Sequence, residues 1–423
     1  MKKNHAKQNN KILVYLWIPL SIGVMFWGTT DLGGLQLHHL AVLPLYLYAA
    51  ALSISQRTLL SLDKKIFILL LYVVVTGLVQ NYQDLGFWLK TFSFCGVAIV
   101  ANHISKTMDL KEFITLSFKA LKFTFLASLL FTAAFTSISF HEVDGANSLN
   151  SFYGQKNTYG RLLYFFIFFC IYAYKIDKKK PTLLAAGYIA VALLALGLTN
   201  SRTSQATAII IILAPLALHM KWTSKAFKVG IIISAVTAIA LIALDCLKIE
   251  NTGGNHDLVS LFSLEIPMSG RTTIWSGGIN ALNLEHKWLF GFGLEGFYNS
   301  PYAKYVTNIG LGDFVPSDSH NGYIDLLLNL GLVGALIYIS ILYRFLTNTR
   351  KTTSPEVRSL FYMFFLIYII SNFTESFFVK TSNITSFMFL LLYLYSYKHI
   401  KTTKPTLTTH YNHIENLALP NKS

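Results

Sequence analysis

The sequence SDSHNG at residues 317–322 runs directly into YIDLLLNLG at residues 323–331. This junction decides the fold, because a polar turn that opens straight into an apolar segment is typical of a loop entering a membrane helix. It closes a stretch from about Asp245 to Gly334, the only long polar interval between strongly apolar segments. We therefore expect a helical membrane protein with one large loop outside the bilayer.

The composition supports this class of protein. The chain has 423 residues, of which 53% are hydrophobic and only 13% are charged, whereas roughly a quarter of a soluble domain is charged. Apolar runs of about 18 or more residues recur along the chain, as expected for membrane-spanning helices. These runs do not alternate between apolar and polar residues, which excludes a transmembrane β-barrel.

The charge distribution indicates topology and not a nucleic-acid partner. The net charge is +15, but the lysines and arginines are spread among short loops, and every second loop is basic. By the positive-inside rule, we expect both termini to be cytoplasmic and the large loop to face outward. In a bacterial inner membrane, the outward side is the periplasm. The basic N-terminal residues and the apolar run after Lys11 predict an uncleaved first helix.

The apolar runs predict about 12 transmembrane helices, with the large loop between helices 9 and 10. We divide the integral membrane domain into helices 1–9 at residues 1–246, a periplasmic loop at 247–322, helices 10–12 at 323–398 and a cytoplasmic tail at 399–423. Within the loop, the spacing of apolar residues predicts a short helix from Thr272 to Leu284. The expected spans begin near Ile12, Leu35, Ile66, Phe87, Phe113, Thr158, Thr182, Ser204, Val229, Tyr323, Ser359 and Asn383.

The few outward cations are the first candidates for a binding site. Arg202 lies in a very short turn between two apolar runs, where an arginine needs an anion or water. As a structural residue, it would snorkel to the membrane surface or pair with an outward acid such as Glu375. As a functional residue, it would bind a lipid-linked phosphate. Arg271 precedes the expected loop helix, whose N-terminal amides suit a diphosphate, although a solvated loop arginine is the simpler reading. Lys156 and Arg161 form a third outward basic cluster, which could also be an ordinary helix start.

The candidate base lies where the loop enters the tenth span. A neutral histidine at His320 could take a proton from a sugar hydroxyl, although a lone histidine is more often structural. Asp318 could orient it, and Glu375 is a second candidate base. No metal site is expected, because the histidines lack ligand-like repetition, and the three cysteines (Cys95, Cys170 and Cys246) lie in or beside apolar segments without paired spacing.

Several of these motifs resemble the O-antigen ligase and polymerase superfamily. Each is weak alone, but their order and their shared outward side are characteristic. The resemblance covers about Tyr153 to Gly334. The motifs are GQKNTYG at 154–160, NSRTS at 200–204, GRTTIW at 270–275, LFGFG at 289–293, SHNGY at 319–323 and LGLVG at 330–334.

The resemblance implies a metal-independent, inverting glycosyltransferase with a GT-C-like fold and no cofactor. Such enzymes transfer a glycan from an undecaprenyl-diphosphate-linked oligosaccharide at the periplasmic face. Arg202 and Arg271 match the arginines that bind the diphosphate in the family, and His320 matches the histidine that helps activate the acceptor. Asn321 would shape the same turn, and Lys156, Arg161, Asp318 and Glu375 are further candidates for binding diphosphate or glycan.

The acceptor and the function class stay open at this point. The motif forms look closer to polymerases of O-antigen or exopolysaccharide repeat units, for which the acceptor is another glycan. A ligase that uses lipid A–core is the alternative within the family. From other classes, a lipid-linked oligosaccharide flippase would carry charges within its spans and two related halves, and a membrane scaffold would not explain the outward arginines.

Overall fold

The structure is a computed structural model that describes residues 2–22, 31–32, 35–80, 85–143, 146–177, 182–218, 258–261, 264–267, 271–298, 300–306, 316, 318–380 and 383–401. Most of these residues are helical. The long helices are α1 (Lys2–Ile22), α2 (Leu37–Ser55), α3 (Lys64–Val79), α4 (Leu85–Thr107), α5 (Leu110–Ala134), α7 (Lys156–Ile176), α8 (Leu183–Leu198), α9 (Arg202–Leu218), α11 (Arg271–Leu284), α13 (Gly322–Lys351), α14 (Pro355–Ser371) and α15 (Ile384–Lys401).

Short elements connect the long helices. The strands in the described part of the chain pair as antiparallel hairpins: β1 (Asp31–Leu32) with β2 (Leu35–Gln36), β3 (Phe140–Val143) with β4 (Ala146–Leu149), and β5 (Leu258–Leu261) with β6 (Leu264–Pro267). The remaining short helices are η1 (Leu59–Ser61), α6 (Thr136–Ser139), η2 (Ser151–Tyr153), η3 (Pro301–Ala303) and α12 (Lys304–Val306).

The helices make this a multi-pass α-helical membrane protein, as expected. Within the described residues, four segments are both long and apolar enough to cross a membrane: Phe87–Thr107, Leu110–Ala134, Lys156–Ile176 and Gly322–Lys351. Helices also lie at or near the other expected positions, except that the ninth, near Val229, falls outside the described residues. The number of twelve spans and the position of the large loop between helices 9 and 10 therefore stay predictions.

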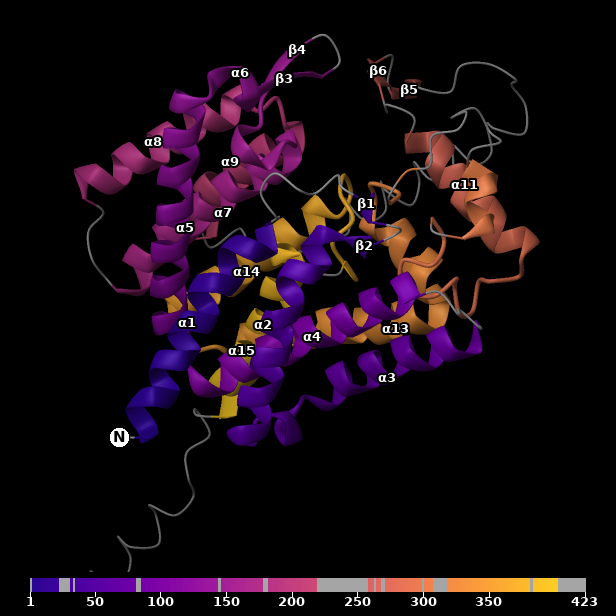
Figure 1. Cartoon of the computed structure of the whole chain (residues 1–423), viewed down its shortest axis with the longest axis horizontal. Coiled ribbons are helices and arrows are strands. Elements are labelled where there is room, and N and C mark those ends of the chain that lie inside the picture. The colour runs from indigo at the N-terminus through magenta and orange to yellow at the C-terminus, as the bar shows by residue number, and fades with distance from the viewer. Residues whose placement is uncertain are drawn as a thin grey trace, which may run out of the picture.

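The bundle is assembled by contacts between neighbouring and distant helices. Helix α5 packs on α7 and α1, α7 packs on α9, and α15 packs on α4. The β3–β4 hairpin and α11 lie at the upper end of the molecule in Figure 1, opposite the N-terminus. Helix α9 also packs on α14, which brings the start of α9 beside the turn that follows α14.

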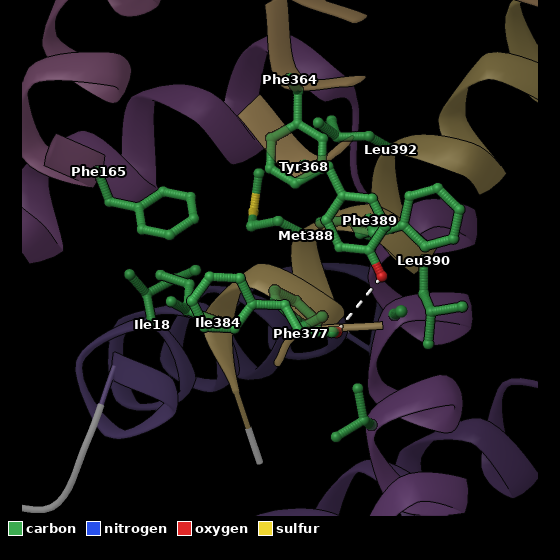
Figure 2. Packing of buried hydrophobic residues seen from close by; sticks show 14 of the residues in the cluster. Ile18, Phe165, Phe364, Tyr368, Phe377, Ile384, Met388, Phe389, Leu390 and Leu392 are labelled. Carbon is green, nitrogen blue, oxygen red and sulfur yellow. Dashed lines mark hydrogen bonds between the residues drawn. The ribbon is translucent and has the colours of Figure 1, made fainter. Parts of the chain in front are cut away.

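That turn, residues 372–380, is fixed by aromatic side chains of the core. Figure 2 shows the Tyr368 ring against Phe389, at 4.4 Å between centroids and almost parallel, with the Tyr368 hydroxyl directed at the Phe377 carbonyl. The hydroxyl of Tyr338 donates a 2.6 Å hydrogen bond to the carbonyl of Phe378. A buried backbone carbonyl without a partner is costly, so these hydroxyls stabilise the turn where it enters the core.

The loop after α11 lies directly against a break in α13. Gly331 has φ +62° inside this helix. This interruption leaves backbone amide and carbonyl groups of α13 without partners in the helix itself. The amide of Leu332 bonds to the Trp288 carbonyl at 2.8 Å, and the amide of Phe292 bonds to the Leu328 carbonyl at 2.6 Å. The break thus joins residues 288–292 to the helix that carries the SDSHNG turn.

Candidate functional site

The turn before α13 is built around Asn321. Its Oδ1 accepts hydrogen bonds from the amides of Tyr323 at 3.0 Å and Ile324 at 3.3 Å, which caps the helix. The hydroxyl of Ser319 donates to the Asn321 carbonyl at 2.7 Å. Asn321 is buried, so its side chain caps α13 from inside the turn.

His320 stands on this turn in an uncommon backbone conformation. Its φ is +51°, a left-handed value that is unfavourable for a residue with a Cβ. The His320 amide donates a 3.0 Å hydrogen bond to Oδ1 of Asp318, which helps to hold this conformation. The imidazole is 37% exposed, but its Nδ1 is buried and lies 3.5 Å from the same Asp318 oxygen. The exposed part of the ring therefore lies away from Nδ1.

Asp318 joins the histidine turn to the segment after α14. Its Oδ2 is 2.8 Å from Nζ of Lys380, and the two side chains are 16% and 26% exposed. Burial by itself would raise the pKa of Asp318, but the charges of Lys380 and His320 and the hydrogen bonds from both residues hold that pKa well below its usual range. The Asp318 carboxylate is thus ionised beside His320.

Glu375 lies where three other elements meet. Its Oε1 accepts a 3.1 Å hydrogen bond from Nδ2 of Asn157, at the start of α7. Its backbone carbonyl accepts a 3.1 Å hydrogen bond from the amide of Gly322, at the start of α13. The hydroxyl of Thr203, in the first turn of α9, donates at 3.1 Å to the hydroxyl of Thr374.

The electrostatic surroundings of Glu375 contain several of the predicted residues. Burial raises the pKa of Glu375; the charges of Arg161, His320 and Arg271 act against this rise, and that of Asp318 adds to it. Arg161 lies with its guanidinium 5.0 Å from the centre of the Phe377 ring. Residues far apart in the sequence, Arg161, Arg271 and His320, therefore act electrostatically on one carboxyl group.

Helix α11 is docked on the histidine turn through Trp275. The indole Nε1 donates a 2.8 Å hydrogen bond to the carbonyl of Ser319. Trp275 also belongs to a buried cluster that includes Phe292, Phe297 and Leu328. The expected loop helix from Thr272 to Leu284 is confirmed with α11 at Arg271–Leu284, so Arg271 is its first residue and lies one turn before Trp275.

Arg202 and Lys156 each occupy the first position of a helix at this junction. Arg202 begins α9 and is exposed, while Lys156 begins α7 and is partly buried. The hydroxyl of Ser201 donates a 2.9 Å hydrogen bond to Oδ1 of Asn157, which ties the two helix starts together. Within the described residues Arg202 forms no ion pair with Glu375, so the structural pairing considered for it is absent there.

Three residues of this site were not among the candidates from sequence. Asn157 and Trp275 belong to quoted motifs, but nothing local in the sequence showed that they bond to Glu375 and Ser319. Lys380 gave the clearest signal, because it is an outward lysine only five positions after Glu375. Among the described residues, no group of three histidine, cysteine, aspartate or glutamate side chains is placed to hold a metal ion.

Comparisons with known proteins agree with the motif resemblance. A family model described as O-antigen ligase matches residues 187–339. This region contains Arg202, Arg271 and His320, whereas Asn157, Glu375 and Lys380 lie outside it. A comparison with curated proteins found none that matches the chain. Residues 187–339 are therefore similar to the O-antigen ligase family, in agreement with the motif resemblance.

Proposed function

We propose that this protein is an inner-membrane glycosyltransferase that transfers a glycan from undecaprenyl diphosphate to a sugar acceptor at the periplasmic face. The observation that carries the proposal is the 2.8 Å bond that joins the helix of Arg271 to the His320 turn. The charges of Arg161, Arg271 and His320, which all act on Glu375, support it. The family match supports a lipid-linked glycan donor and a membrane setting.

In the proposed topology, the described helices belong to a bundle of twelve spans. Both termini are cytoplasmic, and residues 247–322 form a periplasmic loop between the ninth and tenth spans. Residues 1–246 and 323–398 would then be the two membrane parts, and 399–423 the cytoplasmic tail. The basic clusters of every second loop support this orientation.

The proposed reaction is a single displacement at the anomeric carbon. The acceptor oxygen forms a bond to this carbon while the bond to the diphosphate oxygen breaks, and the electron pair leaves with the diphosphate. His320 takes the proton of the acceptor hydroxyl. Arg202 and Arg271 stabilise the negative charge of the leaving diphosphate, so no metal ion is required in this scheme. Attack from the side opposite the leaving group inverts the anomeric centre.

The remaining candidates take supporting roles in this proposal. Lys156 and Arg161 extend the cationic surface for the diphosphate or for the glycan. Glu375 contacts the glycan or the arginines, and Asn321 and Asp318 shape the turn that carries His320. The Trp275 bond to Ser319 links the helix of Arg271 to this turn, which supports a role for both in one site.

We propose repeat-unit polymerisation as the specific activity, with attachment to lipid A–core as the second candidate. The motif forms favour a polymerase, and the description of the matching family favours a ligase. The test uses purified protein with undecaprenyl-diphosphate-linked repeat units, with and without lipid A–core. Long polymers without the core indicate a polymerase, and product that depends on the core indicates a ligase. The absence of both products would contradict the proposal and return the flippase to consideration.

A further inference from the structure

Lys380 is a partly buried cation that the reaction scheme above does not use. Its side chain is 26% exposed, and lysines are seldom buried without a partner. The turn that carries it is anchored in the core, because the Phe377 amide donates to Oδ1 of Asn372 at 2.9 Å and the Phe378 carbonyl accepts from Tyr338 at 2.6 Å. Lys380 is therefore presented from a fixed piece of backbone.

One carboxylate connects Lys380 to His320. Oδ2 of Asp318 receives the ammonium group at 2.8 Å, and Oδ1 faces the His320 amide at 3.0 Å and its Nδ1 at 3.5 Å. Both oxygens are thus engaged, one by the Lys380 ammonium and one by the His320 amide. Nδ1 of His320 makes no hydrogen bond in the described part of the chain, so Oδ1 of Asp318 acts on it through charge. A displacement of the lysine would rotate or shift the carboxylate and release the histidine.

The surroundings of Asp318 are acidic, and Lys380 offsets them. The two residues line a small cavity of about 10 Å³, enough for about one water molecule, together with Asp325 and Glu295. The charge of His320 also acts on Glu375, as do the charges of Arg161 and Arg271. Glu295 already has a cation, since Lys90 lies 3.5 Å away. Without Lys380, Asp318 would share its buried site with other carboxyl groups, and its ionised form would be disfavoured.

We propose that Lys380 is a positioning residue for the reaction: through Asp318 it fixes the backbone and the Nδ1 side of His320, which leaves Nε2 to receive the acceptor proton. This assignment rests on the proposed function, because it requires His320 to act as the base. It predicts that the charge of Lys380 matters through Asp318 and not through contact with the substrate.

The test compares Lys380→Met and Lys380→Arg with the parent protein in the glycan transfer assay. We expect Lys380→Met to lower kcat by about 10- to 100-fold, as is typical when a reacting group is misplaced, with little change in the KM of the lipid-linked donor. Lys380→Arg restores the charge and should recover most of the activity. Lys351→Met is the matched control, because Lys351 is an exposed lysine at the other end of α13.

The pH profile supplies a readout that a purely structural role would not change. Lys380 contributes to holding the pKa of Asp318 low, so its loss should move the acid limb of the kcat profile to higher pH. In an Asp318→Asn background, Lys380→Met should have little further effect on kcat, because the lysine acts through the aspartate. This double variant also removes both members of the Lys380–Asp318 pair together, so neither is left without the other, which keeps the test valid if Lys380→Met alone does not fold.

The outcomes separate this inference from the proposed function. An inactive His320→Ala together with a Lys380→Met protein of parental kcat and pH profile would overturn the role of Lys380 and leave the proposed function standing. The role of Lys380 would also be overturned if Lys380→Met lowered kcat as much in the Asp318→Asn background as in the parent. A fully active His320→Ala protein would instead remove the proposed function, and with it the basis of this assignment.

Discussion

Nδ2 of Asn157 donates a 3.1 Å hydrogen bond to Oε1 of Glu375, a residue 218 positions away in the sequence. This bond joins the start of α7 to the turn that follows α14. The same asparagine accepts the hydroxyl of Ser201 at 2.9 Å, so the start of α9 is tied to the same point. The starts of α7 and α9 and the turn after α14 are thereby held together.

His320→Ala should abolish glycan transfer while the protein remains in the membrane. The alanine lacks the ring that takes the acceptor proton, and removing a general base costs about 10²- to 10⁴-fold in rate. The measurement is the rate of product formation by purified variants at equal protein concentration. His141→Ala is the control, because His141 is an exposed histidine of the β3–β4 hairpin. Transfer at the parental rate by the His320 variant would disprove the assignment of the base.

Arg202→Ala and Arg271→Ala should each lower kcat/KM for the lipid-linked donor by about 10²- to 10³-fold. Each substitution removes a fixed charge that stabilises the leaving diphosphate. Lysine at either position should recover only part of the loss, because an ammonium group cannot bind two phosphate oxygens in the fork geometry of a guanidinium. Arg350→Ala is the control at an exposed arginine at the far end of α13. If Arg350→Ala lowered kcat/KM as much as the other two substitutions, the effect would not be specific to Arg202 and Arg271.

Glu375→Gln should change how stability depends on pH. Burial raises the pKa of Glu375 above its ordinary value, so the ionised side chain is less favourable in the folded protein than in the unfolded one. The folded parent is therefore stabilised by the protonated form of Glu375. It loses this stabilisation as the pH rises from the ordinary pKa of a glutamate through the raised pKa. The glutamine variant lacks this loss, and its amide oxygen can still accept the hydrogen bond from Asn157.

The measurement is the Tm of both proteins in detergent from acid to neutral pH. The Tm of Glu375→Gln relative to the parent should rise across that interval and then level off. A Tm difference that stays constant with pH, or falls as pH rises, would contradict a raised pKa for Glu375.

Gly331→Ala should strongly destabilise the protein and reduce transfer. Gly331 has φ +62°, and a Cβ there would lie 2.5 Å from backbone atoms of Leu289 and Phe290. With ψ at −170°, Gly331 lies in a backbone region that is almost restricted to glycine and costs an alanine about 1–3 kcal/mol. The close contact adds to this cost, because the two backbone segments would have to move apart. The measurement is the Tm in detergent, together with activity.

Gly187→Ala is the matched control for this prediction. Gly187 lies inside α8, and a Cβ built there meets no atom within 4 Å. Alanine in an open helical position is expected to stabilise by about 0.5–1 kcal/mol, since glycine is unfavourable in helix interiors. A Gly331→Ala protein with the Tm of this control would show that residues 288–292 do not pack against α13 as the structure has them.

The sequence by itself determined the class of this protein and most of its local structure. Apolar runs and basic loops identified a helical membrane protein, and the spacing of Ile274, Trp275, Ile279 and Leu282 predicted α11 almost to the residue. The polar turn around Asn321 likewise predicted where α13 begins. These features depend on residues that are close in sequence, so composition, periodicity and helix capping are sufficient to predict them.

Only the tertiary structure decided which candidates share a site. Glu375 was a possible partner of Arg202, yet it bonds to Asn157 and lies in the field of Arg161, Arg271 and His320. Lys380 was one outward cation among several, yet it holds Asp318 beside the histidine. Gly291 and Gly331 belonged to separate motifs, yet both have positive φ where residues 288–292 meet the break in α13. Each of these relations joins segments that are distant in the chain, and local pattern carries no information about such contacts until helix packing brings the segments together.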